Sequence, residues 1–102
     1  MEKNAKVVII GGGVVGCSIL YHLSKFGLKD CILLERNELT SGSSWHAAGN
    51  VHVISNDPNI SRMMAYTIGL YKEIEKESGQ STGFKASGGF YLASNDVWAE
   101  YL

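Results

Sequence analysis

Three glycines and one glutamate in the first third of the sequence have the types and spacing of a phosphate-binding site. Gly11, Gly13 and Gly16 follow a G-x-G-x-x-G pattern, and Glu35 comes 19 residues after Gly16. A glycine turn lets backbone N–H groups approach a pyrophosphate, and the following helix N-terminus adds a partial positive charge. The Glu35 carboxylate could accept hydrogen bonds from ribose hydroxyls and would repel a 2′-phosphate. The pattern therefore favours FAD or NAD over NADP.

The elements that must position these residues are predicted to be a strand, a turn, a helix and a second strand. Val7–Ile10 and Cys31–Leu34 are short apolar runs typical of buried parallel strands. A helix is predicted from Val14 to Phe26, with Gly27 at its C-cap. Its core face is predicted to carry Val15, Ile19, Leu23 and Phe26. Without this context the motif would be weak; the alternative is a glycine turn of another α/β protein.

The second half of the chain predicts a long helix, a hairpin and a truncated helix. Asp57-Pro58 is a helix start, so we expect a helix from Asn59 to Ser78 that is capped by Gly79. Two short strands, 84–86 and 90–93, are predicted to form a β-hairpin, and a last helix to run from Val97 to Leu102. An apolar stripe on the long helix is predicted to face the core and comprises Ile60, Met63, Met64, Thr67, Leu70, Tyr71 and Ile74.

Length and charge limit the possible classes of protein. The 102 residues allow one domain at most, and the net charge of −1 suggests neither nucleic acid nor acidic lipid as a partner. No segment has the length and hydropathy of a membrane span, and we expect a cytoplasmic protein, or a mitochondrial matrix protein in a eukaryote. Because no second βαβ unit follows residue 36, residues 1–102 are interpreted as the N-terminal part of a single larger domain.

The segment Leu39–Gly49, LTSGSSWHAAG, makes the interpretation more specific. Together with VVIIGGGVVGCSILYHLSKFG, LLER and YKEIEKESGQSTGFKASGGFYLA, it resembles the dimethylglycine dehydrogenase and sarcosine dehydrogenase family of flavoproteins, which are D-amino-acid oxidase-like. This resemblance covers nearly the whole chain. It implies an α/β fold: a Rossmann-like FAD-binding βαβ unit followed by a long helix and a β-hairpin, as an incomplete domain.

The resemblance also implies site residues. It places covalent attachment of FAD, through the 8α-methyl carbon of the isoalloxazine, at His46, whose neutral imidazole could act as a nucleophile. Two positions depart from the family: Ser44 stands where Thr is common, and Asn50 where an apolar residue is common. The expected cofactor contacts are Gly11, Gly13, Val14, Val15, Gly16, Glu35, Arg36, Gly42, Ser43, Ser44, Trp45, His46, Ala47, Ala48, Gly49 and Asn50, and no catalytic or metal-binding residue is assigned.

The activity implied by the resemblance is oxidative demethylation of N-methylated glycine derivatives, within one-carbon metabolism. The implied electron acceptor is an electron-transfer flavoprotein or oxygen, and tetrahydrofolate could bind to a later part of the protein. Two alternatives remain open. One is a non-catalytic binding protein similar to the pyruvate dehydrogenase phosphatase regulatory subunit, and the other is an NAD-dependent dehydrogenase.

Overall fold

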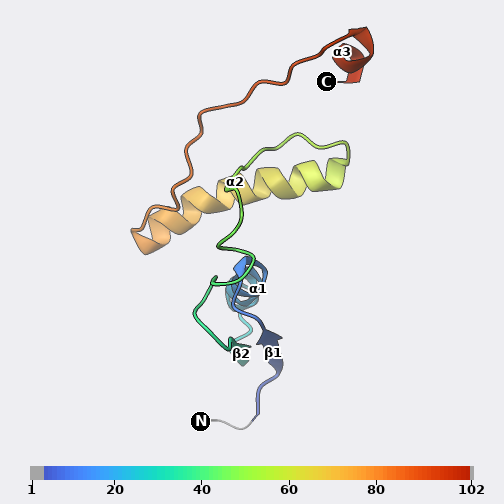
Figure 1. Ribbon diagram of the computed structural model, residues 1–102. Coiled ribbons are helices and arrows are strands. Elements are labelled where there is room, and N and C mark those ends of the chain that lie inside the picture. The colour runs from blue at the N-terminus through green and yellow to red at the C-terminus, as the bar shows by residue number, and fades with distance from the viewer. Residues whose placement is uncertain (1–3, 102) are drawn as a thin grey trace. The chain divides into compact units, whose positions relative to one another are not determined.

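The computed structural model describes residues 4–101, within which two strands and three helices follow one another in the order β1, α1, β2, α2 and α3 (Figure 1). The chain divides into two compact units, with the boundary between Gly49 and Asn50. The first unit contains β1, α1 and β2, and the second contains α2 and α3.

The first unit is a βαβ motif. Strand β1 (Val7–Ile10) pairs in parallel with β2 (Cys31–Leu34), with Val7 opposite Cys31 and Ile10 opposite Leu34. Helix α1 (Val14–Lys25) forms the crossover between them. Because both strands run in the same direction, the turn after β1 and the residues after β2 meet at one edge of the sheet. The predicted Rossmann-like βαβ unit is confirmed.

The predicted core face of α1 is correct only at Leu23 and wrong at Val15, Ile19 and Phe26. Val15 is 70% exposed and Phe26 is 84% exposed, and Phe26 lies just beyond the helix as its C-cap. Leu23 of the predicted face is half-buried, and the other covered residues of this helix include the buried Gly16 and the half-buried Leu20. The physical reason is the absence of a side chain on Gly16, which lets this side of α1 lie closest to β1, so the face through Val15 and Ile19 turns away.

The long helix of the second unit is confirmed as α2 (Pro58–Ser78). The Asp57 side chain accepts hydrogen bonds from the backbone N–H groups of Asn59 and Ile60, and Pro58 occupies the first helical position. Gly79 ends the helix with φ of 69°, a left-handed conformation that a residue without Cβ adopts easily. Leu70 of the predicted apolar stripe is buried, whereas Met63 is exposed, so only part of the stripe faces a core.

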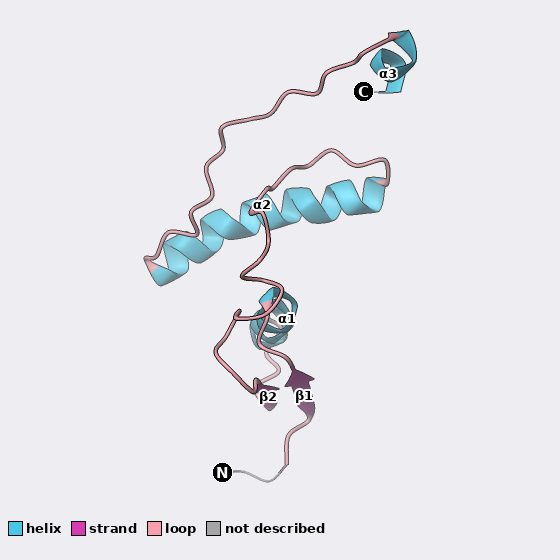
Figure 2. Cartoon of the chain, in the orientation of Figure 1, coloured by secondary structure: helices cyan, strands magenta, loops and turns pink. Residues whose placement is uncertain are grey.

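The predicted β-hairpin is not formed. Residues 80–93 contain no strand and follow an extended path between α2 and α3, as Figure 2 shows. Phe90 is 98% exposed and Leu92 is 92% exposed. Phe84 is half-buried and its ring centroid lies 5.7 Å from that of Tyr71 in α2. An isolated pair of short strands is marginally stable without a further strand or helix to pack against, and in the described chain nothing covers Phe90 or Leu92 in this way.

The last helix, α3, spans Asp96–Tyr101, one residue earlier than predicted at its start. Asn95 is its cap, because its Oδ1 accepts a hydrogen bond of 3.0 Å from the Trp98 N–H. The predicted end of this helix at Leu102 lies outside the described residues.

Burial confirms the prediction of an incomplete domain. Among the described residues, the buried apolar side chains are Ile9 and Leu70. A two-stranded parallel sheet with one crossover helix leaves a sheet face and both strand edges uncovered. The βαβ unit therefore has the uncovered sheet of an incomplete α/β arrangement.

Candidate functional site

The turn between β1 and α1 has the geometry of a phosphate-binding loop. Gly11 has φ of 104°, a conformation that strongly favours glycine, and its N–H donates to the Leu34 carbonyl at 2.8 Å. Gly13 is the N-cap of α1 and has no side chain to cap the helix. The first N–H groups of α1 therefore depend on partners from outside the helix.

Gly16 sets how closely α1 approaches this turn. A Cβ built on Gly16 would lie 1.9 Å from the Gly11 carbonyl oxygen and 3.4 Å from Ile9 Cγ2. The Gly11 oxygen is a backbone atom, which cannot rotate away as a side chain could. The close packing of strand, turn and helix therefore requires glycine at this position.

Gly12 is a site residue that sequence reasoning missed, because the G-x-G-x-x-G pattern leaves its position free. It is buried, and its N–H donates to Glu35 Oε2 at 2.7 Å. Its carbonyl accepts a hydrogen bond from the Thr40 N–H at 2.9 Å. A Cβ at Gly12 would lie 2.5 Å from Leu39 Cδ2 and 3.0 Å from Glu35 Cβ. The run Gly11-Gly12-Gly13 is the feature of the sequence that could have indicated this tight contact.

The Glu35 carboxylate lies at the carboxyl edge of the sheet, just after β2. Its Oε1 accepts a hydrogen bond of 2.9 Å from the Asn37 N–H, while Oε2 accepts from Gly12. The bonds to Gly12 and Asn37 lower the pKa of Glu35, and the neighbouring Arg36 contributes in the same direction. A carboxylate has about four lone-pair sites, so both oxygens can still accept hydrogen bonds from ribose hydroxyls.

The segment after β2 folds back onto the glycine turn. The Val14 N–H, which is predicted to meet a pyrophosphate, donates to Ser44 Oγ at 2.8 Å. A Cβ on Gly13 would lie only 3.1 Å from the same Ser44 oxygen. The structure therefore brings Gly11, Gly13, Glu35 and Ser44 together, although they lie in three separate segments of the sequence.

Trp45 and His46 lie in the turn that follows Ser44, and both side chains are exposed. His46 Nδ1 is 2.9 Å from the Gly42 carbonyl oxygen. A carbonyl oxygen can only accept, so Nδ1 carries a proton, and in the neutral imidazole Nε2 then carries the lone pair. The imidazole therefore presents Nε2 as its nucleophilic nitrogen.

The remaining predicted residues are less closely tied to the glycine turn. Val15 lies in the first turn of α1 and Arg36 directly follows Glu35, and both are exposed. Gly49 has φ of 70° and ends the first unit. Asn50 belongs to the second unit. The other members of the segment, Gly42, Ser43, Ala47 and Ala48, are exposed.

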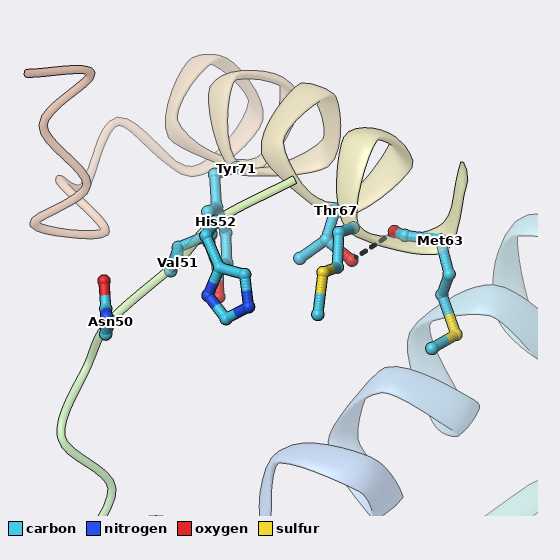
Figure 3. A pocket seen from close by; sticks show the side chains of 7 residues that line it. Asn50, Val51, His52, Met63, Thr67 and Tyr71 are labelled. Atoms are coloured by element: carbon cyan, nitrogen blue, oxygen red, sulfur yellow. Dashed lines mark hydrogen bonds between the residues drawn. The ribbon is translucent and has the colours of Figure 1, made fainter. Parts of the chain in front are cut away.

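The second unit contains a shallow pocket of about 200 Å³ (Figure 3). Met63, Met64, Thr67 and Tyr71 line it from α2, and Asn50, Val51 and His52 line it from the preceding segment. The Thr67 hydroxyl donates to the Met63 carbonyl at 2.9 Å and so is engaged within the helix. The lining is mainly apolar, and the sequence assigned these residues to a core stripe and a loop.

Metal-ligand clusters and membrane-spanning helices are both absent from the described part of the chain. In residues 4–101, no group of three or more His, Cys, Asp and Glu side chains could hold a metal ion. Within the same residues, no helix has the combination of length and hydropathy required to cross a bilayer.

Comparison with known proteins agrees with this geometry. Residues 6–102 match the family described as FAD dependent oxidoreductase. Dimethylglycine dehydrogenase from Homo sapiens is 47% identical over 96 residues, which cover 94% of this chain and 11% of the relative. Sarcosine dehydrogenase from Homo sapiens is 42% identical over 96 residues, covering 93% of this chain and 10% of the relative.

A relative that is not described as a dehydrogenase has a sequence identity similar to that of the two dehydrogenases. The pyruvate dehydrogenase phosphatase regulatory subunit from Mus musculus is 40% identical over 93 residues, covering 91% of this chain and 11% of the relative. The chain thus spans about a tenth of the length of the curated relatives it matches. The match to the family nevertheless extends over the βαβ motif, the Ser44–His46 turn and α2. The chain belongs to the FAD dependent oxidoreductase family.

Proposed function

We propose that this chain is the FAD-binding part of an amine dehydrogenase or oxidase that demethylates N-methylated glycine derivatives, with the flavin attached to His46. The observation that carries the site proposal is the Val14–Ser44 hydrogen bond of 2.8 Å. This bond holds the turn that contains His46 against the turn that has the geometry for phosphate. The substrate class is supported by the similarity to dimethylglycine and sarcosine dehydrogenases.

The residues of the first unit fit the parts of FAD. The N–H groups of Gly11, Gly12 and Val14 already donate within the chain, so the backbone donors proposed for the pyrophosphate are those of Gly13 and Val15. Gly13 also lacks a Cβ that would narrow the approach. Glu35 would hold the adenosine ribose. When bound, FAD supplies the two-electron acceptor that oxidation of a C–H bond beside an amine nitrogen requires.

The role proposed for His46 rests on its tautomer and exposure. Because Nδ1 faces the Gly42 carbonyl, Nε2 is free to form a bond to carbon. His46 is exposed, so a ring system can reach Nε2 without displacing other side chains of the first unit. The exposed Trp45 and the small residues Ala47, Ala48 and Gly49 would then flank the ring, with Gly42, Ser43 and Asn50 at the ends of this segment.

We also propose the remaining components of the reaction. Electrons would leave to an electron-transfer flavoprotein or to oxygen, and tetrahydrofolate would accept a one-carbon unit. None of the described residues is assigned to these two functions or to recognition of the amine. For location we propose the mitochondrial matrix in a eukaryotic cell and the cytoplasm otherwise; relatives described as mitochondrial support only the mitochondrial part of this proposal.

Acid precipitation of the full-length protein tests the attachment. We expect yellow flavin absorbance to remain with the precipitated polypeptide of the wild type and to be released from His46→Ala. His52→Ala is the matched control, because His52 lies in the second unit. Release from all three proteins would contradict covalent attachment while leaving FAD binding intact.

Anaerobic mixing with candidate substrates tests the reaction class. Dimethylglycine or sarcosine should bleach the flavin absorbance, whereas glycine, which lacks the N-methyl group, should leave it unchanged. A full-length protein that binds no flavin would instead favour the second candidate, a binding protein similar to the phosphatase regulatory subunit.

A further inference from the structure

The N-terminus of helix α1 is capped by a side chain that lies 30 residues further along the chain. Its N-cap is Gly13, which has no side chain, so the first N–H groups of the helix need acceptors from elsewhere. Ser44 Oγ accepts the hydrogen bond of the Val14 N–H at 2.8 Å. Ser44 is half-buried, whereas the residues on either side of it are exposed.

The turn that contains Ser44 is fixed to the glycine turn at a second point. The Thr40 N–H donates to the Gly12 carbonyl at 2.9 Å. Thr40 has φ of 65°, a conformation that a β-branched residue adopts only when surrounding bonds hold it there. The Trp45 N–H donates back to the Thr40 carbonyl at 3.1 Å, which closes this turn.

Within the same turn, His46 is held by two contacts. Its N–H donates to the Ser43 carbonyl at 3.2 Å, and its Nδ1 is 2.9 Å from the Gly42 carbonyl oxygen. The position and tautomer of His46 therefore depend on the path of residues 42–46. Among the described side chains of this turn, only the Ser44 hydroxyl forms a hydrogen bond to α1, through the Val14 N–H. This bond therefore fixes the path of residues 42–46 relative to the helix.

We propose that Ser44 is a positioning residue: its hydroxyl joins the phosphate-binding turn to the His46 turn, so that order at one imposes order on the other. A hydroxyl has one O–H donor besides its lone pairs. Ser44 can therefore accept from Val14 and donate to a phosphate oxygen at the same time, which would tighten both turns when a dinucleotide binds. The hydrogen-bonded coupling of the two turns is independent of the proposed function. Only the effect of this coupling on flavin attachment rests on the proposed function.

Hydrogen exchange of the full-length protein without added FAD tests the structural part. We expect Ser44→Ala to accelerate exchange about three- to tenfold in peptides covering both 11–17 and 38–47, since one hydrogen bond is lost. Ser44→Thr keeps a hydroxyl and should restore protection in both peptides. Ser41→Ala is the matched control, because the Ser41 hydroxyl bonds only to the Glu38 carbonyl within its own turn.

Two further measurements separate positioning from a local capping role. The ¹⁵N signals of His46 should report the Nδ1–H tautomer in the wild type and a mixture of tautomers in Ser44→Ala. At saturating FAD, Ser44→Ala should slow covalent attachment about tenfold, and Ser44→Thr should restore it. If Ser44→Ala does not fold, Ser44→Cys, which keeps the shape with a weaker donor and acceptor, should show the same changes to a smaller extent.

The outcomes distinguish this inference from the proposed function. Faster exchange at 11–17, with residues 38–47, the His46 tautomer and the attachment rate unchanged, would overturn the coupling and leave Ser44 as a cap. A wild type without covalent flavin would refute the attachment proposal, whereas the exchange and tautomer data would still decide whether Ser44 couples the two turns.

Discussion

The Glu35 carboxylate accepts a hydrogen bond of 2.7 Å from the Gly12 N–H, across 23 residues of sequence. This bond connects the residue after β2 to the turn after β1, at the edge where the two parallel strands end. It gives Glu35 a structural role besides the contact with ribose that the sequence predicts. The same bond is the largest cause of the lowered pKa of Glu35.

The first prediction concerns pH. Because the pKa of Glu35 is lower in the folded state than its ordinary value of 4.5, the unfolded state binds more protons between these two values. The stabilisation by Glu35 is therefore complete above about pH 4.5 and is lost as the pH falls through the lower folded pKa. Glu35→Gln should reduce the dependence of the melting temperature on pH over this acidic range.

The control for Glu35→Gln is Glu38→Gln, which neutralises an exposed glutamate three residues along the chain. Melting curves of the full-length protein, recorded from about pH 6 to about pH 3, give the comparison. Equal acid dependence in the wild type and Glu35→Gln would contradict the role of the Gly12–Glu35 bond.

The second prediction uses Gly12. In Gly12→Ala the new Cβ would lie 2.5 Å from Leu39 Cδ2 and 3.0 Å from Glu35 Cβ, so both side chains must move. We expect a loss of about 1–2 kcal/mol in the free energy of unfolding, and weaker FAD binding. Leu39 is 59% exposed, so Leu39→Ala alone should change stability by no more than about 0.5 kcal/mol.

The double variant Gly12→Ala/Leu39→Ala makes this prediction specific. Removing the Leu39 side chain should recover about 0.5–1 kcal/mol of the loss, because the nearest clash disappears. The contact with Glu35 Cβ remains, so recovery should be incomplete. Additive effects in denaturant unfolding would show that Leu39 is not the side chain that limits the space at Gly12.

The third prediction is that Gly16→Ala is more damaging than Gly12→Ala. Its Cβ would come within 1.9 Å of a backbone oxygen, that of Gly11, so strand, turn and helix must separate. We expect a loss of about 3 kcal/mol or more and loss of bound flavin, both measurable on the purified protein. Gly69→Ala is the control: nothing lies within 4 Å of its Cβ, and Ala should stabilise α2 by about 0.5–1 kcal/mol. A tolerated Gly16→Ala would refute the close packing.

The sequence predicts the βαβ motif well because its signals are local. The apolar runs, the glycine spacing and Gly27 lie within a few residues of the elements they specify. The caps of α2 are equally local, since Asp57 and Gly79 flank it directly. The contacts that build the site are not local: Gly12 with Glu35 and Val14 with Ser44 are 23 and 30 residues apart. A spacing rule can place the carboxylate but cannot show which N–H it meets.

Two incorrect predictions have one physical origin. The face of α1 through Val15 and the strands expected in residues 84–93 were inferred from apolar residues alone. Burial also needs a partner, and in the described chain neither Val15 nor Phe90 has one. Periodicity indicates which residues can be buried, whereas the number of available strands and helices decides which of them are.

The last prediction concerns the start of α2. Asp57 Oδ1 accepts from the Asn59 N–H at 2.7 Å and lies 3.4 Å from the Ile60 nitrogen, so it satisfies two of the first N–H groups of the helix. Asp57→Ala should cost about 1 kcal/mol in the stability of the second unit, and Asp57→Asn should recover most of it. Hydrogen exchange over residues 58–64 of the full-length protein measures the effect. Asn56→Ala is the control, since Asn56 is exposed and precedes the cap. Equal protection in Asp57→Ala and Asn56→Ala would mean that Pro58 and packing along the helix, rather than the Asp57 carboxylate, fix where α2 begins.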